Sequence, residues 1–141
     1  MVLLLCAGQV AAEPFVDGTH GHRDEPKIVD RRTAKDSVTR GWLLQYPWPD
    51  QEDKSQAWRT VTPTLVISRH GHILRKIEVN DVWSWNFWAS GKEVVLQAGG
   101  SLHGPSVFLR VDVRSGRRLE EWDGEEDDPK APRWVRAADP P

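Results

Sequence analysis

Three glycine-containing turns divide the middle of the chain, and they constrain its fold more than any other feature of the sequence. Each turn separates two runs of apolar or alternating residues; the turns are His70-Gly71, Ser90-Gly91 and Ser115-Gly116. Glycine adopts the positive φ that tight hairpins need, and strands joined by so short a connection pair antiparallel. The spacing predicts an all-β fold, a small antiparallel meander sheet of about six or seven strands, in a domain over residues 41–124.

The segments outside this region have a different composition. Residues 13–40 are polar and mixed in charge, without a sustained apolar period, and we expect an irregular arm there. Residues 125–141 are acidic first and proline-rich later, which is typical of extended chain. We expect Trp134-Val135 to hold part of this tail against the domain.

The strands and turns of residues 82–124 follow one another in a defined order. A strand from Val82 to Phe87 leads into Ser90-Gly91-Lys92, followed by "VVLQAGG", "VFLRVDV", Ser115-Gly116 and "RRLEEW". This order resembles one blade of a WD-type β-propeller, whose repeat spans about 40–45 residues. Residues 64–79 resemble the outer half of a preceding blade. Val111-Asp112 replaces the family's Trp-Asp pair, and a closed propeller needs at least about four blades. The resemblance therefore implies a blade-like meander and not a closed propeller within one chain.

The stretch "VWSWNFW" (82–88) raises the question of an aromatic ligand platform. Side chains alternate along a strand, so Trp83, Trp85 and Phe87 share one face. We expect this face to be core, because aromatic side chains supply much of the buried area of a small sheet. The alternative is a row that stacks on sugar rings, as in a carbohydrate-binding module. Trp88 is predicted on the opposite face, beside the turn, and is the candidate ligand-binding residue.

The histidines form the second candidate site. Four of the five occur in two His-Gly-His triplets, at residues 20–22 and 70–72. Imidazoles two residues apart on a strand can bind one zinc or copper ion. A metal site would combine His70, His72 and His103, with Asp24 and Glu25 as further candidates. Polar residues are also expected in a hairpin turn, and on that interpretation the protein has no cofactor.

The first twelve residues carry no charge and indicate export. The apolar run "VLLLCAG" is followed by small residues before Glu13, as in a signal peptide that an assigned start codon has truncated. A buried N-terminal strand is the alternative. The run is too short to span a membrane, and Leu5 before Cys6 does not fit a lipid anchor. We therefore expect a periplasmic or extracellular protein.

Charge and motifs narrow the function classes. The chain has 19 basic and 21 acidic residues with the signs interspersed, which argues against nucleic acid as a partner. No nucleophile elbow or phosphate loop occurs, so we do not expect an enzyme. The sequence predicts a binding module for a partner protein, or one that self-associates through an edge strand. A histidine-based periplasmic metal-binding protein and a carbohydrate-binding module are the alternatives.

Overall fold

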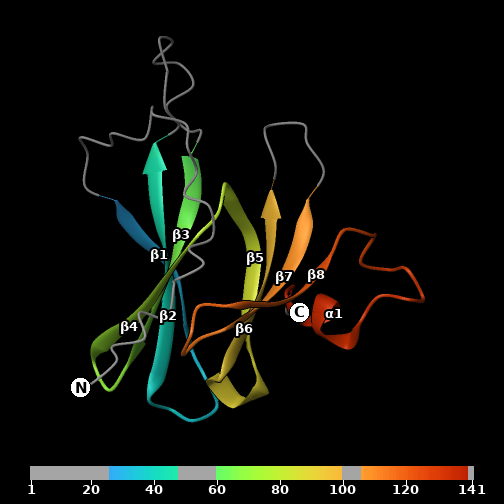
Figure 1. The fold of residues 1–141 in the computed structure, drawn as a ribbon. Coiled ribbons are helices and arrows are strands. Elements are labelled where there is room, and N and C mark those ends of the chain that lie inside the picture. Colours follow the sequence, from blue (N-terminus) through green and yellow to red (C-terminus); the bar gives the residue numbers. More distant parts are fainter. Residues whose placement is uncertain (1–25, 48–59, 100–105, 140–141) are drawn as a thin grey trace, which may run out of the picture.

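The computed structural model describes residues 26–47, 60–99 and 106–139, and these residues form two antiparallel sheets (Figure 1). Sheet A contains β1 (Lys27–Thr33), β2 (Thr39–Pro47), β3 (Thr60–Arg69) and β4 (His72–Glu78). Sheet B contains β5 (Asp81–Trp88), β6 (Glu93–Gly99), β7 (Val107–Asp112) and β8 (Arg118–Trp122). The predicted all-β class is confirmed. The eight described strands form two sheets instead of six or seven strands in one. The predicted signal segment, residues 1–12, lies outside the described residues.

Both sheets are meanders, with strand orders β1-β2-β3-β4 and β5-β6-β7-β8. The three glycines lie in the tight connections between neighbouring strands: Gly71 between β3 and β4, Gly91 between β5 and β6, and Gly116 between β7 and β8. Their φ angles are 79°, 87° and 72°. Gly91 ends a short 3-10 turn, η2 (Ala89–Gly91). These left-handed angles favour glycine over residues with a Cβ.

The predicted irregular arm over residues 13–40 is wrong for its described part, because it contains β1 and the start of β2. β1 is an edge strand with charged residues along it, and the register against β2 shifts between Val29 and Arg32. Asp30, inside that shift, has a φ of 50°. Charges and bulges are common devices at sheet edges. They also remove the apolar alternation from which a strand is recognised in a sequence.

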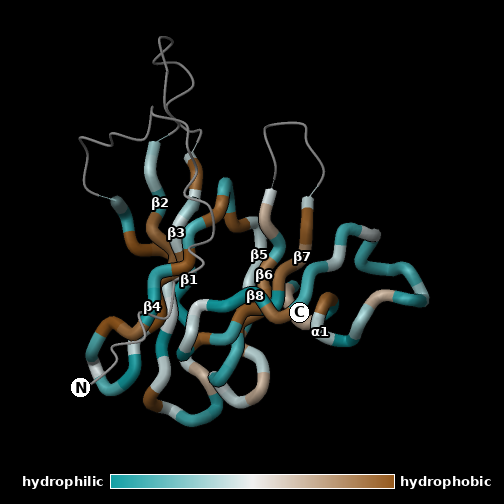
Figure 2. Tube along the Cα trace, viewed as in Figure 1, coloured by the Kyte–Doolittle hydropathy of each residue, from teal (hydrophilic) through white to brown (hydrophobic). Residues whose placement is uncertain are grey.

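The main core lies between the two sheets and is centred on Trp85, which is fully buried. Its ring lies against the backbone of β2 at Gly41, where an added Cβ would be 2.6 Å from Cη2 of the ring. The guanidinium of Arg32 lies 5.2 Å from the Trp85 ring centroid. The half-buried Phe87 meets the same ring edge-on. Figure 2 shows that hydrophobic residues are concentrated in the strands of both sheets.

Trp83, predicted to be buried beside Trp85, is instead 52% exposed. Val82 pairs with Ala98 but Ser84 pairs with Gln97, so one extra residue lies between them in β5. Trp83 is this extra residue. A bulge of this kind resets the alternation of side chains along the strand. Val82 and Trp85 therefore both face the core, three residues apart.

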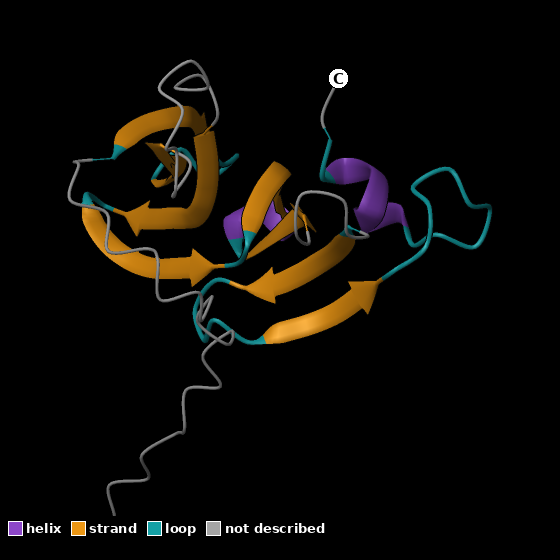
Figure 3. Ribbon diagram, turned by 90° about the horizontal axis from the view of Figure 1, so that it is seen from above, coloured by secondary structure: helices purple, strands orange, loops and turns teal. Residues whose placement is uncertain are grey.

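The face of sheet B that points away from sheet A is covered by the helix α1 (Arg133–Ala137), as the view from above shows (Figure 3). Trp134 and Val135 are buried against Val95 and Phe108. The predicted contact of the tail at Trp134-Val135 is present, but this part of the tail is a helix and not extended chain. Within the described ranges, no helix is long and apolar enough to cross a membrane.

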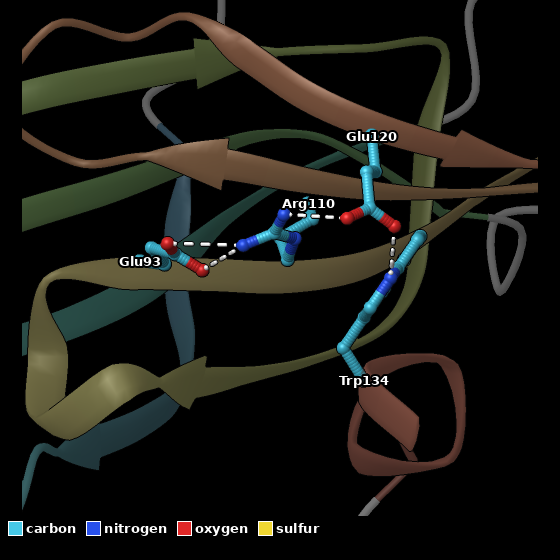
Figure 4. A network of polar contacts seen from close by, with 4 residues as sticks. All are labelled: Glu93, Arg110, Glu120 and Trp134. Atoms are coloured by element: carbon cyan, nitrogen blue, oxygen red, sulfur yellow. Dashed lines mark hydrogen bonds and ion pairs between the residues drawn. The ribbon is translucent and has the colours of Figure 1, made fainter. Parts of the chain in front are cut away.

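A polar network also holds α1 on sheet B (Figure 4). Nε1 of Trp134 donates a hydrogen bond of 2.7 Å to Oε2 of Glu120. Nη2 of Arg110 donates to the other oxygen of Glu120 at 2.6 Å, and its Nη1 bonds Glu93. The hydrogen bond from Trp134, followed by that from Arg110, holds the pKa of Glu120 below its usual value.

The two tryptophans of β5 provide a test of the core. Trp85→Ala is expected to lower the free energy of unfolding by about 3–5 kcal/mol, the usual loss for a buried aromatic side chain. Trp83→Ala, the matched control on the same strand, is expected to cost much less, about 1 kcal/mol, because this residue is 52% exposed. Urea denaturation of both variants measures the difference. Equal losses would contradict the bulged register.

The docking of α1 is expected to weaken in acid. Because the pKa of Glu120 is lowered in the folded state, its contribution to stability is fully present above the unfolded value and is lost as the pH falls through the folded value. Melting temperatures of wild type and Glu120→Gln measured from pH 7 to about pH 3 test this. The two curves should converge on acidification. A constant gap would show that the carboxylate does not contribute to docking.

Candidate functional site

A hollow of about 580 Å³ lies on sheet A, at the end formed by the β1–β2 and β3–β4 turns. The lining residues that matter here are Arg31, Thr33, Arg40, Trp42, Ser68 and His70. We call this hollow the basic groove. It lies on the outer face of sheet A, because Arg40 and Trp42 alternate along β2 with the core-facing Gly41 and Leu43.

Strand register positions the groove residues. Thr33 of β1 pairs with Arg40 of β2, and Arg40 in turn pairs with Ser68 of β3. Arg31 lies inside the bulge of β1, and its guanidinium is 6.0 Å from the centroid of the Trp42 ring. The bulge thus places a cation beside an aromatic face at the sheet edge. Such an arrangement fits a cation–π contact.

The turn between β1 and β2 is held by the Asp36 carboxylate. Its Oδ1 accepts hydrogen bonds from the backbone N–H groups of Val38 and Thr39, at 3.0 and 2.8 Å. Its Oδ2 accepts one from the Thr39 hydroxyl. The Thr39 hydroxyl and then the Thr39 N–H keep the pKa of Asp36 below its usual value. This carboxylate fixes the rim of the groove, where Ser37 and Val38 lie.

The groove carries a surplus of positive charge. Arg32 pairs with Asp30 at 2.9 Å. Arg31 and Arg40 have no carboxylate partner in the described chain, and no Asp or Glu lines the groove there. Guanidinium groups bind carboxylates and phosphates through two parallel hydrogen bonds, and they stack on aromatic rings. The arrangement therefore has the chemistry that suits an anionic group.

The structure does not assemble the predicted metal site from the histidines it describes. His70 lies in the β3–β4 turn with a φ of 51°, and His72 begins β4; both are exposed. His103, like the earlier candidates at residues 20–25, lies outside the described residues. Within 26–47, 60–99 and 106–139, no three His, Cys, Asp or Glu side chains gather as metal ligands do. Zinc or copper binding stays a prediction, and His70 instead lines the basic groove.

The exposure of the two candidate tryptophans, Trp83 and Trp88, is the reverse of the prediction. Trp88 is half-buried and packs against the cluster under α1. Trp83 is the exposed ring: its Nε1 donates to Asp81 at 3.2 Å. The ring lies over Gly99, where an added Cβ would overlap Nε1.

Sequence reasoning missed the basic groove because most of its charged residues fall in the range interpreted as irregular chain. One signal was available. Arg40, Trp42 and Leu44 alternate with Gly41 and Leu43, which is the period of a strand with two different faces. If residues 39–47 had been interpreted as a strand, the cation of Arg40 and the aromatic ring of Trp42 would have been predicted side by side on one face.

Comparison with known proteins adds no identity: no family model, no curated protein and no solved structure matches the chain.

Proposed function

We propose that the protein is a binding module that holds an acidic polypeptide segment in the basic groove. The observation that carries the proposal is the pair of arginines, Arg31 and Arg40, which line the groove without carboxylate partners in the described chain. The guanidinium of Arg31 lies beside the Trp42 ring. The hydroxyl group of the exposed Thr33 adds a hydrogen-bond donor to the same surface. A carboxylate accepts from both kinds of donor.

The charges favour an acidic peptide over nucleic acid. A nucleic-acid surface is a long basic stripe on a basic domain, whereas this chain has a net charge of −2. The two groove arginines, Arg31 and Arg40, lie in one hollow at one end of one sheet. A few such cations fit the side chains of a short acid-rich segment. They are too few to contact the successive phosphates of a nucleic-acid backbone.

The predicted export signal adds a location to the proposal, and the blade-like repeat adds an origin for the scaffold. The signal-like residues 1–12 would place the module in the periplasm or outside the cell. The four strands β5–β8 occupy almost the same range as the predicted blade, residues 82–124, and a propeller blade also has four strands. This agreement supports a blade-type origin for the scaffold that carries the groove.

The groove is tested by charge reversal. A fluorescein-labelled hexaglutamate peptide is titrated with wild type and with Arg31→Glu/Arg40→Glu, and anisotropy reports binding. We expect the variant to bind about 30-fold more weakly, because attraction at two exposed positions becomes repulsion. Wild-type affinity should also fall at about 0.5 M salt, where charges more than a few ångströms apart are screened.

Arg117→Glu/Arg118→Glu is the matched control. It makes the same change of charge at two exposed positions, one just before β8 and one at its start, and should leave binding within about twofold of wild type. Equal losses in the two variants would show a response to net charge alone and contradict the groove. Competition by single-stranded DNA at lower concentration than the peptide would assign the groove to nucleic acid instead.

A sugar ligand is the second candidate, supported by the exposure of Trp83. Its ring is 52% exposed, and the Asp81 carboxylate beside it can accept hydrogen bonds from sugar hydroxyls. Binding to immobilised polysaccharides, measured by retardation in affinity gels, should be abolished in Trp83→Ala and unchanged in Arg31→Glu/Arg40→Glu. Retention of Trp83→Ala equal to wild type would contradict this candidate.

A further inference from the structure

We infer that the acidic segment held in the basic groove is residues 123–128 of a second copy of this chain, so that copies associate head to tail. This inference rests on the proposed function of the groove and names its occupant. Five of the six residues in this segment are acidic, with the sequence "DGEEDD". The segment follows β8, and Figure 2 shows that the loop after β8 is mostly hydrophilic.

Charge is segregated between the two ends of the molecule. The described residues of sheet A and its turns, 26–47 and 60–79, contain eight Lys or Arg and three Asp or Glu. The C-terminal part, residues 106–139, contains seven Lys or Arg and nine Asp or Glu, five of them within 123–128. Opposite charge at opposite ends favours an encounter in which unlike ends meet.

The positions of the two surfaces exclude a contact within one copy. Sheet B stands between sheet A and the orange-red loop that follows β8 (Figures 1 and 3). The groove lies on the face of sheet A that points away from sheet B. A contact between the two surfaces therefore joins two copies, and it uses different surfaces on each. Such a contact builds a row or a ring unless two copies exchange it reciprocally about a two-fold axis.

The acidic segment is held in shape while its charges stay available. Nε1 of Trp122 donates to the backbone oxygen of Glu125, and the Asp128 carboxylate accepts from the Lys130 N–H at 2.8 Å. The side chains of Glu125, Glu126 and Asp127 take part in no ion pair or hydrogen bond in the described chain. A loop already ordered in the free protein loses less entropy when it binds.

Two complementary variants test the inference. The groove variant is Arg31→Glu/Arg40→Glu, and the loop variant is Glu125→Gln/Glu126→Gln/Asp127→Asn, which leaves Asp128 in its structural role. Sedimentation velocity follows each protein from about 10 µM to about 1 mM, a range that detects weak contacts. We expect the average mass of wild type to rise with concentration at about 0.05 M salt and to return to the monomer at about 0.5 M.

Mixing the variants gives the sharpest readout. Each alone should remain monomeric, because one of its two surfaces is lost. An equimolar mixture should form a 1:1 complex and nothing larger, because the groove variant keeps its acidic segment and the loop variant keeps its groove. A melting temperature equal to that of wild type verifies that each variant keeps the fold.

The remaining outcomes separate the two proposals. Monomeric wild type at every concentration overturns the self-association, and hexaglutamate binding that persists then leaves the proposed function standing. Association that neither variant changes also overturns it and assigns the contact to another surface of the protein. Wild type that neither self-associates nor binds hexaglutamate overturns both proposals together.

Discussion

The contact of the Trp85 ring with the backbone of β2 at Gly41 is the constraint on which the rest of the structure depends. The ring is fully buried, and its Nε1 has no hydrogen-bond partner among the described atoms, so packing and the neighbouring Arg32 hold it in place. A side chain at position 41 would overlap the ring. This close approach fixes the distance between the sheets and determines which face of β2 points inward.

The outer surface follows from that inner contact. Alternation along β2 places Arg40 and Trp42 outward once Gly41 and Leu43 point inward. The bulge in β1 then brings Arg31 beside Trp42. Sheet B differs, because α1 covers its outer face and Glu120 binds Trp134 there. Sheet A thus presents arginines beside Trp42 at the groove end of its outer face, where sheet B presents a second core.

The sequence predicts the hairpins of this fold better than it predicts which side chains of each strand face the core. A glycine turn between two apolar runs needs only local information, and β3 to β8 lie where those turns require. A bulge leaves no such local mark. The extra residue at Trp83 reverses the expected faces of β5 before Trp85, and the bulge at Asp30 and Arg31 hides β1. The basic groove was missed for the same reason, since it depends on pairing among β1, β2 and β3.

The two faces of β2 serve different purposes: one contributes to stability and the other to recognition. Residues of one parity contact the core, and residues of the other parity line the groove, so a change at Arg40 alters charge without opening the contact at Gly41. The hydrogen bonds that the Asp36 carboxylate accepts in the β1–β2 turn contribute to both stability and recognition, because they fix the hairpin that carries the rim of the groove. The same strand can therefore keep a core that tolerates little change and a surface whose charges are open to change. The head-to-tail inference depends on this independence, since each of its two surfaces can be altered without the other.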